Sequence, residues 1–470
     1  MKEGILMYNI YLKDLLNLCN AKLIKGNLDT VLDNFSKDTR TINENDIYVG
    51  IYGENFDGNI LYKEAFSKGA KGCILNNNIE LDLEYLNSLS DIFVVVVNDT
   101  IECLQELAKY KRSLYNIPVI GITGSVGKTS TKDIIASVLS KKYKVLKTEG
   151  NYNNHIGVPL TILSLKDENC LVIEMGMNNL GEISLLSKIA KPTVSVITNI
   201  GTAHIGNLGS RENILKAKLE ILDGMDNKIL VINNDNDMLH NYYLENKNNN
   251  ITTFGYQNKS DYMATKIISN DLSSEYDVLI NNKKYRFQIN VPGNHFVSNS
   301  LCAISIGMIF DINIEDIKNG IENFILTKRR MQIEKINNIT IINDCYNANL
   351  DSMSSAINYL GSLKNTRKIA ILGDMLELGI FEEELHRKVG KVVFDNNIDI
   401  LITVGRASRY INEEVIKLGF DKNNIYSFSN NLEVINKIKE IIKENDTLLI
   451  KSSYGMNFIE IYNSIKEILE

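Results

Sequence analysis

The chain has 470 residues, of which 44% are hydrophobic and 23% are charged, as is typical of globular proteins. Its length predicts about three domains. A formal net charge of −7 argues against nucleic-acid binding and against binding to anionic membranes. No apolar run approaches the roughly 20 residues of a membrane span, and no signal peptide is recognisable. The six cysteines lack metal-binding spacing and are expected to be reduced, so we expect a cytoplasmic protein.

Residues 1–112 predict a small α/β unit. Short hydrophobic runs, among them a β-branched run, alternate with segments of helical periodicity, which favours buried strands connected by helices. Polar stretches at 37–41 and 53–58 are rich in turn-forming residues, and by themselves they predict ordinary surface loops. We expect strands at residues 46–50, 72–75 and 93–97 and helices at 61–68 and 101–113.

The strongest motif follows a strand expected at residues 118–122. Gly124 and Gly127 bracket a turn, and Lys128 and Thr129 begin a helix. This is a short G-x-x-G-K-T form of the phosphate-binding loop, in which glycines allow backbone N–H groups to surround phosphate oxygens. Lys128 would reach the terminal phosphates and the Thr129 hydroxyl would bind Mg²⁺. The alternative is a glycine-rich turn that binds nothing. The expected ATP-binding residues of the loop are Gly124, Ser125, Val126, Gly127, Lys128, Thr129 and Ser130.

Two polar side chains follow strands of this second unit, residues 113–327. Its alternating strands and helices predict a mainly parallel sheet with helices on both faces. Glu174 follows a strand at 170–173 and His204 follows one at 194–197, and such sheets bind ligands at the carboxyl ends of their strands. A carboxylate beside a phosphate loop favours a Mg²⁺ site, although an imidazole is an unusual Mg²⁺ ligand. The alternatives are a solvated cap for Glu174 and a structural role for His204.

Residues 328–470 predict a third α/β unit. Strands are expected at 339–342, 368–372, 400–404 and 447–450, and polar motifs follow the first two, at residues 343–349 and 373–379. No G-x-G-x-x-G sequence follows any of these strands. The unit therefore lacks the dinucleotide-binding fingerprint, although its topology is expected to be Rossmann-like.

Taken in order, these motifs resemble those of the ATP-dependent Mur ligases of peptidoglycan synthesis. The resemblance covers essentially the whole chain. It implies an α/β, three-domain architecture. Residues 1–112 would form a small domain that binds the uridine-nucleotide substrate, residues 113–327 a central ATP-binding domain, and residues 328–470 a Rossmann-like domain. The last of these would close on ATP and bind D-alanyl-D-alanine.

The resemblance also implies a role for individual residues. Lys218, which by pattern alone lies on the solvated face of a helix at 210–225, matches a lysine that the family carbamylates as a metal ligand. In the segment after Gly293, Phe296 replaces the usual Asn. The implied catalytic residues are Lys128, Glu174, His204 and Lys218. The implied magnesium ligands are Thr129, Glu174, His204 and carbamylated Lys218. The implied binding residues for the uridine nucleotide are Thr39, Arg40, Gly53, Asn55, Asp57, Asn151 and Asn154, and those near the adenine are His295 and Asn299.

The segment from Asp344 to Asn349 is the most discriminating motif. It resembles the D-x-Y-N-A-N-P sequence of the family members that add D-alanyl-D-alanine, with Leu350 in place of the proline. Arg330 matches an arginine that holds the nucleotide together with Asp344. Residues 451–456 depart from the usual Lys-Gly-Ser-Arg sequence at Ser452 and Tyr454. The implied binding residues in this region are Arg330, Asp344, Tyr346, Asn347 and Asn349.

The activity implied is ATP- and Mg²⁺-dependent ligation of D-alanyl-D-alanine to UDP-N-acetylmuramoyl-tripeptide through an acyl phosphate. We expect a monomer with no nucleic-acid partner and no membrane insertion. Two alternatives stay open. One is another ligase of the superfamily, such as a folylpolyglutamate synthase or a different muramyl ligase. The other is a phosphate-loop NTPase that regulates or binds without ligation.

Overall fold

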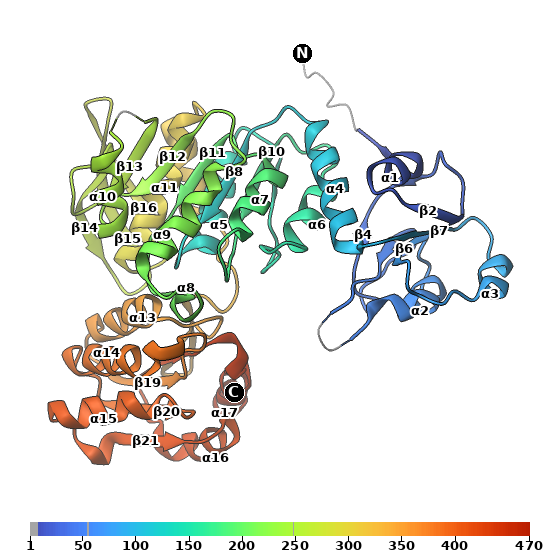
Figure 1. Ribbon diagram of the computed structural model, residues 1–470. Helices are drawn as coiled ribbons and strands as arrows, with labels where there is room; N and C mark the ends of the chain where they lie inside the picture. Colours follow the sequence, from blue (N-terminus) through green and yellow to red (C-terminus); the bar gives the residue numbers. More distant parts are fainter. Residues whose placement is uncertain (1–7, 54–55, 248) are drawn as a thin grey trace.

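The structure is a computed structural model (Figure 1) that describes residues 8–53, 56–247 and 249–470. Asn55, an expected substrate-binding residue, lies outside these ranges. In the described residues, strands form a five-, a nine- and a six-stranded sheet and one short pair, β1 (Ile10–Tyr11) with β3 (Val31–Leu32). The strands of each larger sheet come from one of the three α/β units that the sequence predicts. No helix in the described ranges is both long enough and apolar enough to cross a membrane.

The first sheet has the strand order β2-β7-β6-β5-β4. Its strands are parallel except for β2, which pairs antiparallel with β7. The three expected strands are confirmed, and the expected first helix begins at Tyr62 because residues 58–61 form a 3₁₀ turn capped by Asp57. The elements are β2 (Lys22–Lys25), β4 (Phe35–Ser36), β5 (Ile47–Val49), β6 (Gly72–Asn76), β7 (Phe93–Val97), α1 (Leu12–Leu18), α2 (Tyr62–Ser67), α3 (Leu83–Ser88) and α4 (Thr100–Ser113).

The central sheet has the order β16-β15-β14-β13-β12-β11-β8-β10-β9. From β9 to β14 it is parallel, and β8, β10 and β11 at its centre are wholly buried, as their hydrophobic sequences predict. Its strands are β8 (Val119–Thr123), β9 (Val145–Lys147), β10 (Cys170–Glu174), β11 (Val194–Ile197), β12 (Ile229–Asn233), β13 (Ile251–Gly255), β14 (Tyr262–Ser269), β15 (Ser274–Ile280) and β16 (Lys283–Ile289).

Helices cover both faces of this sheet (Figure 1). The helix that follows the phosphate loop, α5 (Lys128–Leu139), packs against α11 (Asn294–Ile309) on one face, while α7 (Glu182–Ala190) and α9 (Arg211–Leu219) lie on the other. The antiparallel strands β14–β16 were not predicted. β14 and β16 are partly exposed and carry a weak hydrophobic pattern, and β15, although largely buried, includes the polar residues Ser274, Glu275 and Asp277. The remaining helices are α6 (Gly157–Leu163), α8 (Ile205–Leu208), α10 (Asp237–Glu245) and α12 (Ile314–Glu322).

The third sheet has the order β17-β18-β22-β19-β20-β21 and is parallel except for β17, an edge strand. The four expected strands are confirmed, with β20 at the predicted bounds. The strands are β17 (Gln332–Ile336), β18 (Ile339–Asn343), β19 (Arg367–Gly373), β20 (Ile400–Val404), β21 (Ile425–Phe428) and β22 (Asp446–Lys451). The helices are α13 (Leu350–Ser362), α14 (Glu382–Asp395), α15 (Arg409–Leu418), α16 (Asn431–Ile441) and α17 (Ile459–Leu469).

Candidate active site

A cavity of about 610 Å³ lies where the second and third units meet. The carboxyl ends of β8, β10 and β11 form one wall, and the segment after β18 forms another. Sequence motifs that are more than 200 residues apart therefore face one space. The expected site residues that line this cavity are Ser125, Val126, Gly127, Lys128, Thr129, Ser130, Asn151, Asn154, Glu174, His204, His295, Asn299, Arg330, Asp344, Tyr346, Asn347 and Asn349.

The phosphate loop is held in a fixed shape by the segment that follows β11. The N–H groups of Ser125 and Val126 donate to Asn199 Oδ1 at 3.0 and 2.8 Å. Gly124 has a φ of +152°, and a Cβ there would lie 1.9 Å from Thr198 Oγ1, so only glycine allows this approach. The loop ends at the N-terminus of α5, whose first N–H groups have no acceptor within the helix. These free N–H groups face the cavity and suit phosphate oxygens.

Lys128 is the first residue of α5, and its Nζ donates to Gly124 O at 2.7 Å across the loop. Removal from water lowers the pKa of Lys128, and the nearby Glu174 carboxylate opposes that shift. Arg330, from beyond the linker to the third unit, adds positive charge to the same wall. The cavity thus places two cationic side chains beside the helix N-terminus, which is the electrostatic setting that a polyphosphate requires.

Glu174 is the last residue of β10 and is 1% exposed. Its Oε1 accepts a hydrogen bond from Asn153 Nδ2 at 2.8 Å. Its Oε2 is also buried, yet it has no hydrogen-bond partner among the described residues. A buried carboxylate oxygen without a partner is costly, and a cation is the ligand that it suits best. The structure excludes the alternative of a solvated cap for Glu174.

His204 precedes the short helix α8 and has a left-handed backbone, with a φ of +62°. Its Nδ1 lies 2.9 Å from Glu377 Oε2 in the third unit. His204 lines the cavity with Glu174 and Thr129, so the structure brings together three of the four expected metal ligands. These three side chains fit a hard cation such as Mg²⁺, since they offer a carboxylate, a hydroxyl and one imidazole nitrogen.

Lys218, the fourth expected ligand, lies on α9 and is 1% exposed. The interpretation of Lys218 as a residue of a solvated face is therefore wrong. It does not line the cavity itself, and no ion pair in the described ranges includes it. Burial and the charge of Lys128 lower the pKa of Lys218 well below its ordinary value. Among the described residues, no group of three or more His, Cys, Asp or Glu side chains is placed to hold a metal ion. A full set of metal ligands here would therefore have to include groups other than these four side-chain types.

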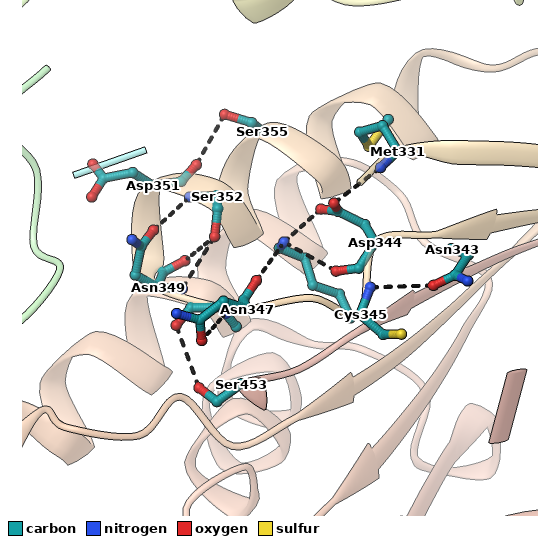
Figure 2. Close-up of polar contacts among 12 residues, drawn as sticks. Met331, Asn343, Asp344, Cys345, Asn347, Asn349, Asp351, Ser352, Ser355 and Ser453 are labelled. Atoms are coloured by element: carbon teal, nitrogen blue, oxygen red, sulfur yellow. Dashed lines mark hydrogen bonds and ion pairs between the residues drawn. The ribbon is translucent and has the colours of Figure 1, made fainter. Parts of the chain in front are cut away.

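The third unit contributes the segment from Asp344 to Asn349, which Figure 2 shows. Lys451 Nζ donates to Asp344 Oδ2 at 2.5 Å and to the Asn347 carbonyl at 3.1 Å. Met331 N donates to Asp344 Oδ1 at 3.1 Å. Asn349 caps α13, because its Oδ1 accepts from Ser352 N at 2.9 Å. A buried lysine and a helix cap thus fix the backbone of this motif.

The wall near the expected adenine site is formed by His295 and Asn299 at the start of α11. Burial lowers the pKa of His295 to about 4, so its imidazole is neutral at pH 7. A Cβ on Gly127 would lie 3.0 Å from Asn299 Oδ1, which places this amide directly beside the phosphate loop. Both side chains can therefore act as neutral hydrogen-bonding groups toward a nucleotide.

The expected residues of the first unit do not reach this cavity. Thr39 is buried, and Arg40 is exposed and paired with Asp38 at 2.6 Å. Asp57 lines a second cavity, of about 400 Å³, together with Asn59 and Asn76. Gly53 lines neither cavity. The residues of this unit that are expected to bind the uridine nucleotide are thus separate, in this conformation, from those expected to bind ATP.

The sequence reasoning missed several residues that shape the cavity. Asn153 and Asn199 hold Glu174 and the phosphate loop, and Lys451 holds Asp344. Asn153 lies between the expected residues Asn151 and Asn154, and Lys451 directly follows the strand expected at 447–450, so position gave a signal for both. No sequence pattern pointed to Asn199, because asparagine is common in the loops that follow strands.

Comparison with known proteins gives a consistent result. Residues 122–307 match the Mur ligase middle domain, and residues 329–454 match the family model described as Mur ligase, glutamate ligase domain. The chain is 36% identical over 460 residues to the UDP-N-acetylmuramoyl-tripeptide–D-alanyl-D-alanine ligase of Bacillus subtilis, covering 96% of this chain and 97% of that protein.

Solved structures agree with the sequence relatives. The crystal structure of MurF from Acinetobacter baumannii has a TM-score of 0.86 at 27% identity and covers 98% of this chain and 99% of its own. The MurF ligase of Thermotoga maritima, solved in complex with ADP, has a TM-score of 0.79 at 25% identity, covering 93% and 98%. The chain belongs to the Mur ligase family, in the branch of the UDP-N-acetylmuramoyl-tripeptide–D-alanyl-D-alanine ligases.

Proposed function

We propose that this chain ligates D-alanyl-D-alanine to UDP-N-acetylmuramoyl-tripeptide at the expense of ATP, in the synthesis of peptidoglycan. One observation carries the proposal. A single cavity is lined both by the phosphate loop and by residues of the segment from Asp344 to Asn349, which resembles the motif of the family members that add D-alanyl-D-alanine. ATP and the incoming dipeptide can therefore meet over the carboxylate that is to be activated.

The chemistry requires activation because a carboxylate does not condense with an amine in water. Transfer of the γ-phosphoryl group of ATP to the tripeptide carboxylate gives an acyl phosphate and ADP. The dipeptide amine attacks its carbonyl carbon, a tetrahedral intermediate forms, and inorganic phosphate leaves as the amide is completed. Such phosphoryl transfer depends on positioning and on charge neutralisation more than on covalent catalysis by the protein.

The nucleotide binds through the phosphate loop in this proposal. The free N–H groups at the start of α5 hold the phosphates, and Lys128 Nζ leaves Gly124 O to neutralise the terminal phosphoryl group. Arg330 and Asp344 hold the nucleotide from the third unit, while His295 and Asn299 lie near the adenine. The shared cavity and the family's ADP-bound relative support this arrangement.

Magnesium would be held by Thr129, Glu174 and His204, with Lys218 completing the set as a carbamate. When bound, the ion offsets charge on the phosphates and on the carboxylate that reacts. The buried Oε2 of Glu174, which has no hydrogen-bond partner in the part of the chain that the structure describes, supports a cation at Glu174. Burial of Lys218 supports the carbamate. An uncharged amine is the form that reacts with CO₂, and burial of a lysine favours that form.

We assign residues 1–112 to the uridine nucleotide, with Thr39, Arg40, Gly53, Asn55 and Asp57 as its binding residues. Residues 113–327 form the ATP-binding domain, in which Asn151 and Asn154 face the same substrate, and residues 328–470 form the closing domain. Tyr346, Asn347 and Asn349 contact the dipeptide. Closure would exclude water, which would otherwise hydrolyse the acyl phosphate. We further propose a cytoplasmic monomer.

Phosphate release tests the proposal. Purified protein is incubated with Mg²⁺, ATP and UDP-N-acetylmuramoyl-tripeptide, with and without D-alanyl-D-alanine, and the nucleotide product is identified by mass. Rapid phosphate release and pentapeptide product only when the dipeptide is present support the proposal. Hydrolysis that is independent of both substrates would indicate an NTPase without ligation. Product formation with a single amino acid, but not with the dipeptide, would indicate another ligase of the superfamily.

A further inference from the structure

The motif at residues 373–379 has no role in the mechanism above, yet it forms a direct contact between the third unit and the central one. Glu377 Oε2 lies 2.9 Å from His204 Nδ1, across 173 positions of sequence. Gly206 N also donates to the Glu377 carbonyl, at 3.2 Å. The start of α8, together with His204 before it, and the loop after β19 therefore meet through both side chain and backbone.

The motif is held rigidly by its own unit up to the residue before Glu377. The Asp374 carboxylate accepts from Arg406 N at 3.0 Å and from Ser408 N at 2.7 Å. Met375 N donates to His386 Nε2 at 3.0 Å, and the next N–H, of Leu376, donates to Ser453 Oγ at 2.9 Å. Since three successive residues are anchored, the place where Glu377 meets the central unit is fixed by the fold of the third unit.

Close backbone approach on both sides defines the contact further. A Cβ on Gly206 would lie 2.5 Å from the Glu377 carbonyl oxygen and 2.7 Å from Gly379 N, so no larger residue fits there without a shift. Glu377 and His204 each adopt a left-handed backbone, with φ of +62°. Non-glycine residues adopt this conformation infrequently, and here both do so at a single contact.

Stability does not account for the pair. The Glu377 side chain is 55% exposed and that of His204 is 21% exposed, and ion pairs in such surroundings contribute little to folding. The pair instead fixes the orientation of the His204 ring. An imidazole whose Nδ1–H donates to a carboxylate has its tautomer and ring direction fixed, and its Nε2 lone pair is left for a ligand.

We propose that Glu377 is a positioning residue that acts through His204. When the third unit docks against residues 201–206, Glu377 accepts the Nδ1–H of His204 and keeps Nε2 unprotonated and available to a divalent cation. Docking of the closing domain and completion of the cation site are thereby one event. This inference rests on the proposed role of His204 in the ligase reaction.

Asp351 supports docking independently of the imidazole. Its Oδ2 accepts from Thr202 N at 2.8 Å and from Thr202 Oγ1 at 3.1 Å, and a Cβ on Gly201 would lie 2.2 Å from the same oxygen. Two carboxylates of the third unit, those of Asp351 and Glu377, thus contact one loop of the central unit. Of these two carboxylates, Glu377 contacts the histidine and Asp351 contacts Thr202, so the effect of Glu377 on His204 can be separated from docking as such.

Four variants separate positioning from structure. Glu377→Ala removes the acceptor. Glu377→Gly also removes it, but relieves the left-handed backbone, so a purely structural role predicts a variant at least as good as the wild type. Glu377→Gln keeps an amide oxygen that can accept the Nδ1–H. Glu384→Ala is the matched control, because Glu384 is exposed and pairs with Lys388 of its own helix at 2.6 Å.

The first readout uses neither nucleotide nor magnesium. The chain has five histidines, so ¹⁵N-imidazole NMR at about pH 8, above the ordinary histidine pKa, can resolve the His204 ring, assigned with His204→Gln. We expect protonation at Nδ1 in the wild type, in Glu377→Gln and in Glu384→Ala, and a shift toward Nε2 protonation in Glu377→Ala and Glu377→Gly. An unchanged tautomer in the last two overturns the proposal.

The second readout is the Mg²⁺ concentration that gives half-maximal phosphate release. It should rise about 10- to 100-fold in Glu377→Ala and Glu377→Gly, as when a partner of a metal-bound histidine is lost, with KM for the uridine nucleotide unchanged. A wild-type magnesium requirement in Glu377→Gly overturns the proposal. Failure of the wild type to ligate at all would count against the proposed function instead, and the NMR result would still decide the contact.

Discussion

The guanidinium carbon of Arg330 lies 4.0 Å from the centre of the Tyr346 ring. Arg330 lies in the third unit just before β17, and Tyr346 follows β18, so the contact lies within that unit at the cavity wall. Arg330 Nε is buried without a hydrogen-bond partner among the described residues. The aromatic face therefore positions this cation, with a stabilisation of about 0.5–2 kcal/mol, and leaves its N–H groups for a ligand.

From this contact we expect Arg330→Ala to weaken the use of ATP and to spare the uridine nucleotide. Loss of a charged hydrogen-bond donor costs about 1.5–3 kcal/mol, which corresponds to a rise of roughly 10- to 100-fold in KM for ATP. Tyr346→Phe keeps the ring beneath the guanidinium and should change KM for ATP much less. Steady-state kinetics with each substrate varied in turn provides the measurement. Equal losses for both nucleotides would contradict the assignment of Arg330 to ATP.

Lys128 is expected to be needed for chemistry and not for folding. Among the described residues, its Nζ donates across its own loop to Gly124 O and to no other group, so removal of the amine should leave the sheet and α5 intact. Loss of a preorganised charge at the transferred phosphoryl group costs on the order of 10²–10³ in rate. Lys128→Ala should therefore show a kcat reduced by that factor and a nearly unchanged melting temperature. Lys141→Ala, at an exposed lysine just beyond the same helix, is the control and should remain fully active.

Lys218 is expected to act as a carbamate. Lys218→Ala should lose most activity, and acetate should restore part of it by placing a carboxylate in the vacated space. Lys218→Arg keeps a positive charge but cannot form the carbamate, so it should be as inactive as Lys218→Ala and should resist acetate. Ligation assays across a range of acetate concentrations provide the measurement, and full activity of Lys218→Arg would show that a simple cation suffices.

His295 is expected to make the stability of the folded protein depend on pH, with a sign that follows from its lowered pKa. Its pKa is lowered to about 4 by burial, whereas the unfolded chain has a histidine pKa near 6.5, so the unfolded state binds more protons between these values. The free energy of unfolding is therefore unaffected by this histidine above about pH 6.5. It falls as the pH drops toward 4, by at most about 3 kcal/mol, because a buried neutral ring opposes protonation. His295→Gln should lose less stability than the wild type over this window. Thermal unfolding of the two proteins from pH 7 to pH 4 compares them directly, and parallel curves would contradict the assignment.

The sequence by itself determined the local motifs. Glycine spacing, a Lys-Thr pair and helical periodicity placed the phosphate loop between β8 and α5, because backbone freedom and hydrophobic period are properties of neighbouring residues. Glu174 was predicted at the end of a buried strand and lies there, 1% exposed. The three α/β units were likewise predicted from alternating strands and helices, while the strands β14–β16, in which polar residues interrupt the hydrophobic pattern, were not.

The tertiary structure alone decided which of these motifs meet. The central order β11-β8-β10 places residues after three separate strands at one edge, and the docking of the third unit brings Glu377 to His204. It also showed that Lys218, on an ordinary-looking helix, is buried. Strand order, burial and contact between units depend on packing of surfaces that lie far apart in sequence, so local residue patterns do not specify them.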